Sequence, residues 1–149
     1  MPDCATIAAL KEALEDEYKA RATYRKVIER FGPVRPFINI VEAEDRHAKA
    51  LLRLLERRGS PPSPDRWPER VSAPGSLREA CAAAIEAEIE NAAMYDRLLR
   101  AIDDPEALGV MRRLQYASQH HHLPAFRRCL ENKGGGNGRG RRRRSGWGS

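Results

Sequence analysis

The sequence predicts an all-α protein, a four-helix bundle, and three observations carry this prediction. Ala, Leu, Glu and Arg dominate the 149 residues, whereas runs of β-branched residues are nearly absent, and such a composition favours helices. Four long segments place apolar residues at alternating steps of three and four, which is the period of one helix face. A proline-rich break separates the second segment from the third. At this length one domain with one core is expected.

The first helix is predicted from about Asp3 to Phe31. Asp3 suits the position before the first turn, because its carboxylate accepts hydrogen bonds from the free N–H groups there. The apolar residues of one face are Ile7, Leu10, Leu14, Tyr24, Ile28 and Phe31. Gly32 and Pro33 end the helix, since neither residue favours its continuation.

The second helix is predicted from about Pro36 to Arg58. Its apolar face carries Phe37, Ile40, Val41, Ala48, Leu51, Leu54 and Leu55. Gly59 ends the helix, and Arg57 and Arg58 stand in its last turn, where cations suit the helix dipole.

Residues 59–75 hold five prolines and cannot form a helix interior. Fully extended, this linker reaches ~55 Å, whereas a helix of ~22 residues is only ~33 Å long. The linker can therefore cross the length of the bundle and start the third helix parallel to the second. The third helix opens with a capping box, Ser76 and Glu79, and is predicted to reach about Ile102.

The fourth helix is predicted from Pro105, preceded by the cap Asp104, to about Glu131. Pro124 must kink this helix or interrupt its hydrogen bonding, because proline has no backbone N–H. The predicted domain is therefore a bundle over residues 1–132.

The formal charge of +6 lies entirely in a C-terminal tail. After Asn132 there are six bases and no acid, so residues 1–132 carry 21 bases and 21 acids. The neutral body argues against a basic nucleic-acid-binding domain. The Gly/Arg-rich tail, residues 133–149, is predicted to be disordered. It either binds nucleic acid non-specifically, with an affinity that falls as salt rises, or only solubilises the chain.

Membrane insertion and structural cysteines are not expected. No stretch approaches ~20 apolar residues, and the N-terminus is amphipathic and acidic, unlike a signal peptide. Cys4, Cys81 and Cys129 are odd in number and form no C-x-x-C pair. They are predicted to be reduced thiols in a cytoplasmic protein, and a zinc-ribbon or rubredoxin-like module is excluded.

The two halves of the bundle resemble each other. At an offset of 71 residues the first and third helices match Glu17 with Glu88 and Tyr24 with Tyr95. At an offset of 75 the second and fourth helices match Glu44 with Gln119 and His47 with His122. The chain therefore looks like two similar helix hairpins joined by the linker.

Polar residues interrupt the apolar face of every helix. They are Glu17, Glu44, His47, Glu88 and His122, and Gln119 lies three residues before the last of them. Burying an unpaired carboxylate costs several kcal/mol, and three would consume most of the marginal stability of a domain. A metal ion would compensate, because divalent cations bind carboxylate oxygen and imidazole nitrogen together.

The spacing of these residues fits a dimetal centre. Residues three apart share a helix face, so Glu44 and His47 can bind one ion. A Glu from each of two helices, with Glu-x-x-His from each of the other two, is the recurrent di-iron or di-manganese arrangement. We expect Glu44 to bridge or chelate the ions and Glu17 and Glu88 to be terminal carboxylate ligands. His47 and His122 are each expected to bind one ion. Gln119 is expected to bind weakly or only to form a hydrogen bond with a metal-bound water.

Two motifs of the chain, Glu17-x-x-Ala20-Arg21-x-x-Tyr24 and Glu44-x-x-His47-Ala48, are similar to motifs of rubrerythrins. On these motifs the chain resembles the ferritin-like superfamily over roughly residues 5 to 131. Phe31-Gly32-Pro33, Arg35-Pro36-Phe37 and His122-Leu123-Pro124-Ala125-Phe126 are closer to an uncharacterised prokaryotic ferritin-like family of unknown function. The resemblance implies a non-haem iron or manganese centre with oxidoreductase or ferroxidase-type chemistry on O₂, peroxide or ferrous iron.

Two departures from the rubrerythrin pattern predict an asymmetric or single-metal site. Gln119 stands in the place of the second bridging Glu, and Asn91 stands where rubrerythrins have an additional Glu. The rubredoxin-type cysteine module is also missing, so full rubrerythrin activity is not expected.

Two alternatives to a metal centre remain open. Glu17 could pair with Arg21, four residues on, within an ordinary buried ion-pair network. The chain could also be a metal-free interaction module whose tail binds polyanions. On either interpretation a homodimer stays open. His120 and His121 are expected to lie outside the core, because neighbouring helical residues point about 100° apart.

Overall fold

The computed structural model describes residues 3–61 and 63–135, and every regular element within them is helical. The elements are α1 (Cys4–Phe31), α2 (Phe37–Arg57), η1 (Trp67–Glu69), α3 (Leu77–Ala101), α4 (Pro105–Ala117), η2 (Ser118–His122) and α5 (Leu123–Gly135). The prediction of an all-α fold is confirmed. None of the helices in the described residues is long and apolar enough to cross a membrane.

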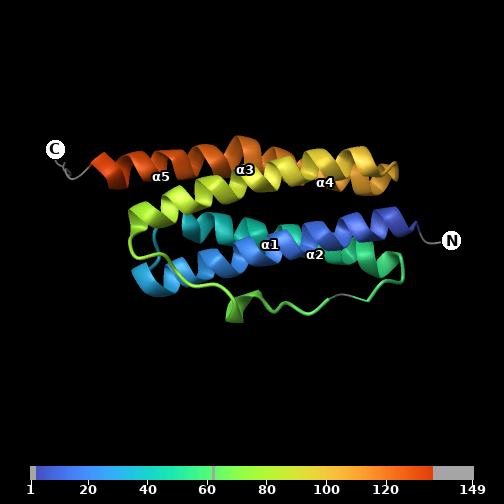
Figure 1. The fold of residues 1–149 in the computed structure, drawn as a ribbon, viewed down its shortest axis with the longest axis horizontal. Coiled ribbons are helices and arrows are strands. Elements are labelled where there is room, and N and C mark those ends of the chain that lie inside the picture. The colour runs from blue at the N-terminus through green and yellow to red at the C-terminus, as the bar shows by residue number, and fades with distance from the viewer. Residues whose placement is uncertain (1–2, 62, 136–149) are drawn as a thin grey trace.

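The helices form an elongated bundle (Figure 1). α1 and α2 are antiparallel neighbours, and α3 lies beside both α1 and α5. The segment between α2 and α3 returns along the outside of α1, so that α2 and α3 point the same way. The α4–η2–α5 rod then runs back beside α3.

The helix caps follow the sequence signals. Asp3 accepts hydrogen bonds from the N–H groups of Ala5 and Thr6, and Ser76 accepts one from Glu79. Gly32 ends α1 with φ of 91°, a conformation that L side chains rarely adopt. α5 extends to Gly135, three residues into the predicted tail. Residues 136–149, the rest of that tail, lie outside the described residues.

The linker is fastened to α1 by polar contacts. Arg21 binds Asp45 of α2 at 2.7 Å and Asp65 of the linker at 3.0 Å. The indole N–H of Trp67 donates to Glu15 at 2.9 Å, and the ring packs against the core. Arg21 is therefore engaged on the outside of α1, and the ion pair with Glu17 that the sequence left open is not formed.

The predicted fourth helix is interrupted just before Pro124. Over Ser118–His122 the backbone forms a π-helical turn, in which the N–H of Leu123 donates to the carbonyl of Ser118 five residues back. Pro124 has no N–H, so the regular α-helical ladder cannot continue through it. The interruption that the sequence predicts is therefore a π turn within a continuous rod.

The core consists of two apolar clusters, one toward each end of the bundle. One includes Leu10, Leu14, Leu51, Leu54 and Met111, and the other includes Tyr24, Val27, Phe37, Ala84 and Phe126. α1, α2 and α3 and the α4–η2–α5 rod each contribute residues to both clusters. Each of them carries a buried Glu or His where it passes from one cluster to the other. The polar residues therefore form a layer in the middle of the core.

The prediction of three reduced cysteines is wrong for two of them. Cys81 of α3 and Cys129 of α5 form a disulfide across 48 residues of sequence, whereas Cys4 is free and exposed. The spacing of the cysteines in the sequence does not predict this pairing. The two residues meet because α3 packs against α5. The cytoplasmic location stays a prediction and loses one of its supports.

Candidate metal centre

Five of the six predicted site residues converge in the polar layer of the core. Glu17 comes from α1, Glu44 and His47 from α2, Glu88 from α3 and His122 from η2. Only 1% of Glu17, 2% of Glu44, 2% of Glu88 and 4% of His122 is exposed to solvent, and His47 is partly buried. Carboxylate and imidazole groups therefore meet in a space largely closed to water.

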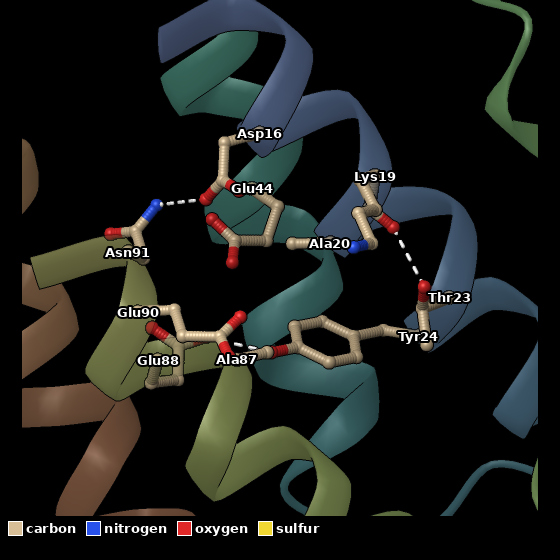
Figure 2. A pocket seen from close by; sticks show the side chains of 10 residues that line it. All are labelled: Asp16, Lys19, Ala20, Thr23, Tyr24, Glu44, Ala87, Glu88, Glu90 and Asn91. Carbon is tan, nitrogen blue, oxygen red and sulfur yellow. Dashed lines mark hydrogen bonds between the residues drawn. The ribbon is translucent and has the colours of Figure 1, made fainter. Parts of the chain in front are cut away.

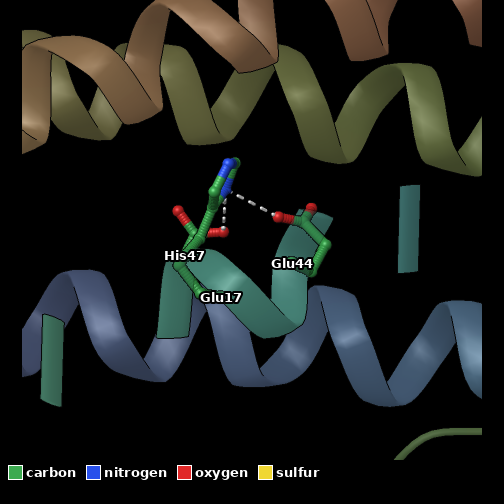
Figure 3. Close-up of side chains that lie close together, drawn as sticks. All are labelled: Glu17, Glu44 and His47. Atoms are coloured by element: carbon green, nitrogen blue, oxygen red, sulfur yellow. Dashed lines mark ion pairs between the residues drawn. The ribbon is translucent and has the colours of Figure 1, made fainter. Parts of the chain in front are cut away.

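The five residues form two triads that share Glu44. In the first, His47 Nδ1 lies 3.6 Å from Glu17 Oε1 and 3.1 Å from Glu44 Oε1 (Figure 3). In the second, His122 Nδ1 lies 3.4 Å from Glu88 Oε1 and 3.9 Å from Glu44 Oε2. Within each triad one ligand atom per residue lies within 4.8 Å of the others. Each triad can therefore present two oxygens and one nitrogen to a single ion.

The two triads are related by the repeat in the sequence. The His47 and His122 rings stack with centroids 5.5 Å apart. Tyr24 donates a hydrogen bond to Glu88 at 2.8 Å, and Tyr95 donates one to Glu17. Each tyrosine thus holds the carboxylate of the other half. These bonds fix the outer oxygens of Glu17 and Glu88 and leave their inner oxygens facing the histidines.

The three carboxylates of the layer have no basic partner other than histidine. Within residues 3–61 and 63–135, neither lysine nor arginine pairs with Glu17, Glu44 or Glu88. Burial, followed by the charges of Glu17 and Glu88, raises the pKa of the Glu44 carboxyl well above its ordinary value. Burial alone would raise the pKa of Glu17, but the hydrogen bond and charge of His47, with hydrogen bonds from Glu44 and Tyr95, lower that pKa overall. Within the described residues, histidine is therefore the only basic group that can balance the three carboxylates.

Gln119 does not join the cluster. It is exposed, because residues four apart rather than three share a face in the wider π turn. Ser118, four residues before His122, is buried instead and donates a hydrogen bond to Glu88 Oε1 at 2.7 Å. The prediction that Gln119 points toward the site is therefore wrong, and Ser118 takes its place. Pro124 predicted an interruption of the fourth helix, but it did not predict the π turn that changes which residues of this segment face the core.

A small cavity of about 40 Å³ between α1 and α3 reaches the carboxylates from outside (Figure 2). Glu44 and Glu88 point into it, and Asn91 donates a hydrogen bond to Asp16 at 2.7 Å across its rim. Burial, and next the charge of Glu17, raises the pKa of Asp16 to about 6 against the opposing effect of the Asn91 bond. Sequence reasoning missed Asp16, which lies off the apolar face of α1.

Replacing Asp16 by Asn is expected to stabilise the metal-free protein at pH 7. The raised pKa means that the folded state holds the proton more tightly, so stability is lost as pH rises from about 4 to about 6. The amide does not ionise, and the expected gain in unfolding free energy at pH 7 is about 1 to 3 kcal/mol. Urea unfolding of chelator-treated protein measures this gain, which should nearly vanish at pH 4. An equal gain in unfolding free energy at both pH values would contradict the raised pKa of Asp16.

The sequence matches no known family profile and no curated protein. Its fold is similar to the crystal structure of a hypothetical protein from Methanococcus jannaschii DSM 2661, with a TM-score of 0.77 and 24% sequence identity. The likeness covers 86% of this chain and 81% of the archaeal one. At that identity it concerns the fold alone: an all-helical bundle is an arrangement that this chain shares with a solved protein.

Proposed function

We propose that Glu17, Glu44, His47, Glu88 and His122 hold two divalent metal ions, iron or manganese, with Glu44 shared between them. The observation that carries this proposal is the pair of buried triads meeting at one carboxylate. Oxygen and nitrogen ligands in this proportion suit iron and manganese, and neither triad includes a cysteine, the ligand that most favours softer metals.

Unpaired polar atoms support the fit of cations to this layer. Glu44 Oε1 and His122 Nδ1 are buried and make no hydrogen bond within the described residues. Buried groups of this kind are rare, because each costs about 1–3 kcal/mol when it lacks a partner. Both atoms face other members of the triads. A cation between them would give both a partner and offset the repulsion among the three carboxylates.

The proposal places the chain with the ferritin-like proteins. Support comes from the parallel α2 and α3 joined by a long outer linker, and from inward-facing carboxylates and histidines on all sides of the bundle. Because Gln119 is exposed, each triad keeps one histidine, one carboxylate of its own and the shared Glu44. We therefore propose two ions with matched ligand sets, in place of the asymmetric site with one strong and one weak metal position that the sequence predicts.

When bound, iron or manganese supplies electron-transfer chemistry with O₂, peroxide or ferrous iron, and the proposed activity is an oxidoreductase of this type. The residues of the chain hold and shield the centre. Tyr24 and Tyr95 fix the terminal carboxylates, and the cavity below Asp16 and Asn91 gives a small reactant a path to Glu44 and Glu88.

Removing either histidine is expected to remove one of the two ions. Full-length protein, stripped with chelator, is titrated anaerobically with Fe(II) and with Mn(II), and bound metal is measured after gel filtration. Wild type should bind two equivalents, and His47→Ala and His122→Ala one each, because each histidine belongs to a single triad. His120→Ala, an exposed change beside the site, is the matched control and should keep both.

Admitting air to the iron-loaded protein tests the activity separately. Growth of ferric absorbance, at a rate reduced in both histidine variants, supports redox chemistry at the centre. Wild type that binds neither Fe(II) nor Mn(II) stoichiometrically would overturn the metal proposal and favour the metal-free interaction module.

A further inference from the structure

A groove, separate from the cavity at Asp16, lies between the N-terminal end of α2 and the η2 and α5 part of the α4–η2–α5 rod. Its volume is about 510 Å³, within the range of small-molecule sites. The exposed polar side chains that line it are Arg35, Asn39, His121, Arg128 and Asn132. Part of its wall is the buried residue His122, so the groove and the polar layer of the core share one imidazole.

The groove collects positive charge without any negative charge to balance it. Among the described residues that line it there are two guanidinium groups and no carboxylate. Neither Arg35 nor Arg128 forms an ion pair within residues 3–61 and 63–135, whereas Arg58 and Arg21 are both paired with aspartates. Two like charges beside one cavity repel each other, and an anion between them is attracted by both. The groove therefore lacks a counterion.

The donors in the groove suit an oxyanion in particular. A guanidinium offers parallel N–H groups that match two oxygens of a carboxylate or phosphate. The amide groups of Asn39 and Asn132 add neutral donors on the α2 and α5 sides of the same opening. The apolar part of the lining, which includes Ile40 and Ala125, suits a short carbon chain.

We propose that this groove binds a small oxyanion, a phosphate or a short carboxylic acid, between Arg35 and Arg128. The site lies on the outer side of His122, away from the carboxylates that its Nδ1 faces. The proposal does not depend on bound metal, since none of its polar donors belongs to either triad.

Calorimetric titration of chelator-treated, full-length protein tests this site with two probes, inorganic phosphate and succinate, at constant ionic strength. Saturable binding of one equivalent is expected for at least one probe. The probe that binds more tightly shows whether the groove prefers a phosphate or a carboxylic acid. Arg35→Gln and Arg128→Gln should each weaken that binding about tenfold or more, because each removes a charge-assisted pair of hydrogen bonds. Both positions are exposed, so helical circular dichroism should not change.

Arg112→Gln is the matched control, an exposed arginine on the same rod outside the groove. It should bind the probe as wild type does. Absence of saturable binding for both probes would overturn the proposal, and so would an equal loss in all three variants, which would indicate attraction to net charge alone. Failure of the metal titration would leave this result unchanged, because the calorimetry uses metal-free protein.

Discussion

Glu44→Gln is expected to abolish stoichiometric binding of both metal ions while the bundle stays folded. Glu44 is the one residue common to the two triads, with Oε1 3.1 Å from His47 Nδ1 and Oε2 3.9 Å from His122 Nδ1. An amide of the same shape carries no charge and cannot bridge two cations as a carboxylate does. Metal analysis after anaerobic Fe(II) titration should fall from two equivalents to none, a larger loss than either histidine variant gives.

Stability separates this result from simple unfolding. The pKa of Glu44 is raised in the folded state, so the folded protein loses stability as the pH rises above the ordinary pKa of a glutamate. The amide of Gln does not ionise and avoids this loss. Chelator-treated Glu44→Gln should therefore unfold at the same or a higher urea concentration than metal-free wild type, with the larger advantage at pH 7 than at pH 4. Glu42→Gln, an exposed change on the same helix, should keep both ions. Retention of two ions by Glu44→Gln would contradict the shared role.

Local signals predicted the helices well, because capping and breaking act within a few residues. Asp3 and Ser76 cap as expected, and Gly32 ends the first helix in a left-handed conformation. The residues that face the core follow from the three-four spacing, and this spacing brought Glu17 and Glu88 to the layer between the two apolar clusters. Tyr24 and Tyr95, which the repeat matches to each other, are both buried, and each donates a hydrogen bond to a carboxylate.

What the sequence could not supply depends on register and on packing between helices. The spacing rule assumes an α-helix, and the π turn before Pro124 turned Gln119 outward while keeping His122 inside. The crosswise pairing of Tyr24 with Glu88 joins residues 64 apart, and the disulfide joins residues 48 apart. Such contacts depend on which helices are neighbours, which the periodicity of a single helix does not contain.

Phe126→Ala is expected to cost about 3–5 kcal/mol of unfolding free energy, a large part of the stability of a domain this size. The Phe126 side chain is fully buried, and its ring centroid lies 5.2 Å from that of Tyr24 and 5.0 Å from that of Phe37. Truncation leaves a cavity that these rings cannot fill without moving. Urea unfolding of chelator-treated protein measures the loss, and Tyr116→Ala, at an aromatic that is 57% exposed, should change stability by no more than about 0.5 kcal/mol.

The same substitution should reach the metal centre through Tyr24. Phe126 packs against the ring whose hydroxyl holds Glu88, so the cavity frees that ring and weakens the bond that orients the carboxylate. Metal affinity should therefore fall mainly at the triad of Glu44, Glu88 and His122, while the triad of His47 keeps its affinity. Tyr24→Phe removes the hydroxyl with little change in packing, and combined with Phe126→Ala it should lower affinity less than the sum of the two changes. Full additivity would mean that the aromatic cluster supports the fold without positioning Glu88.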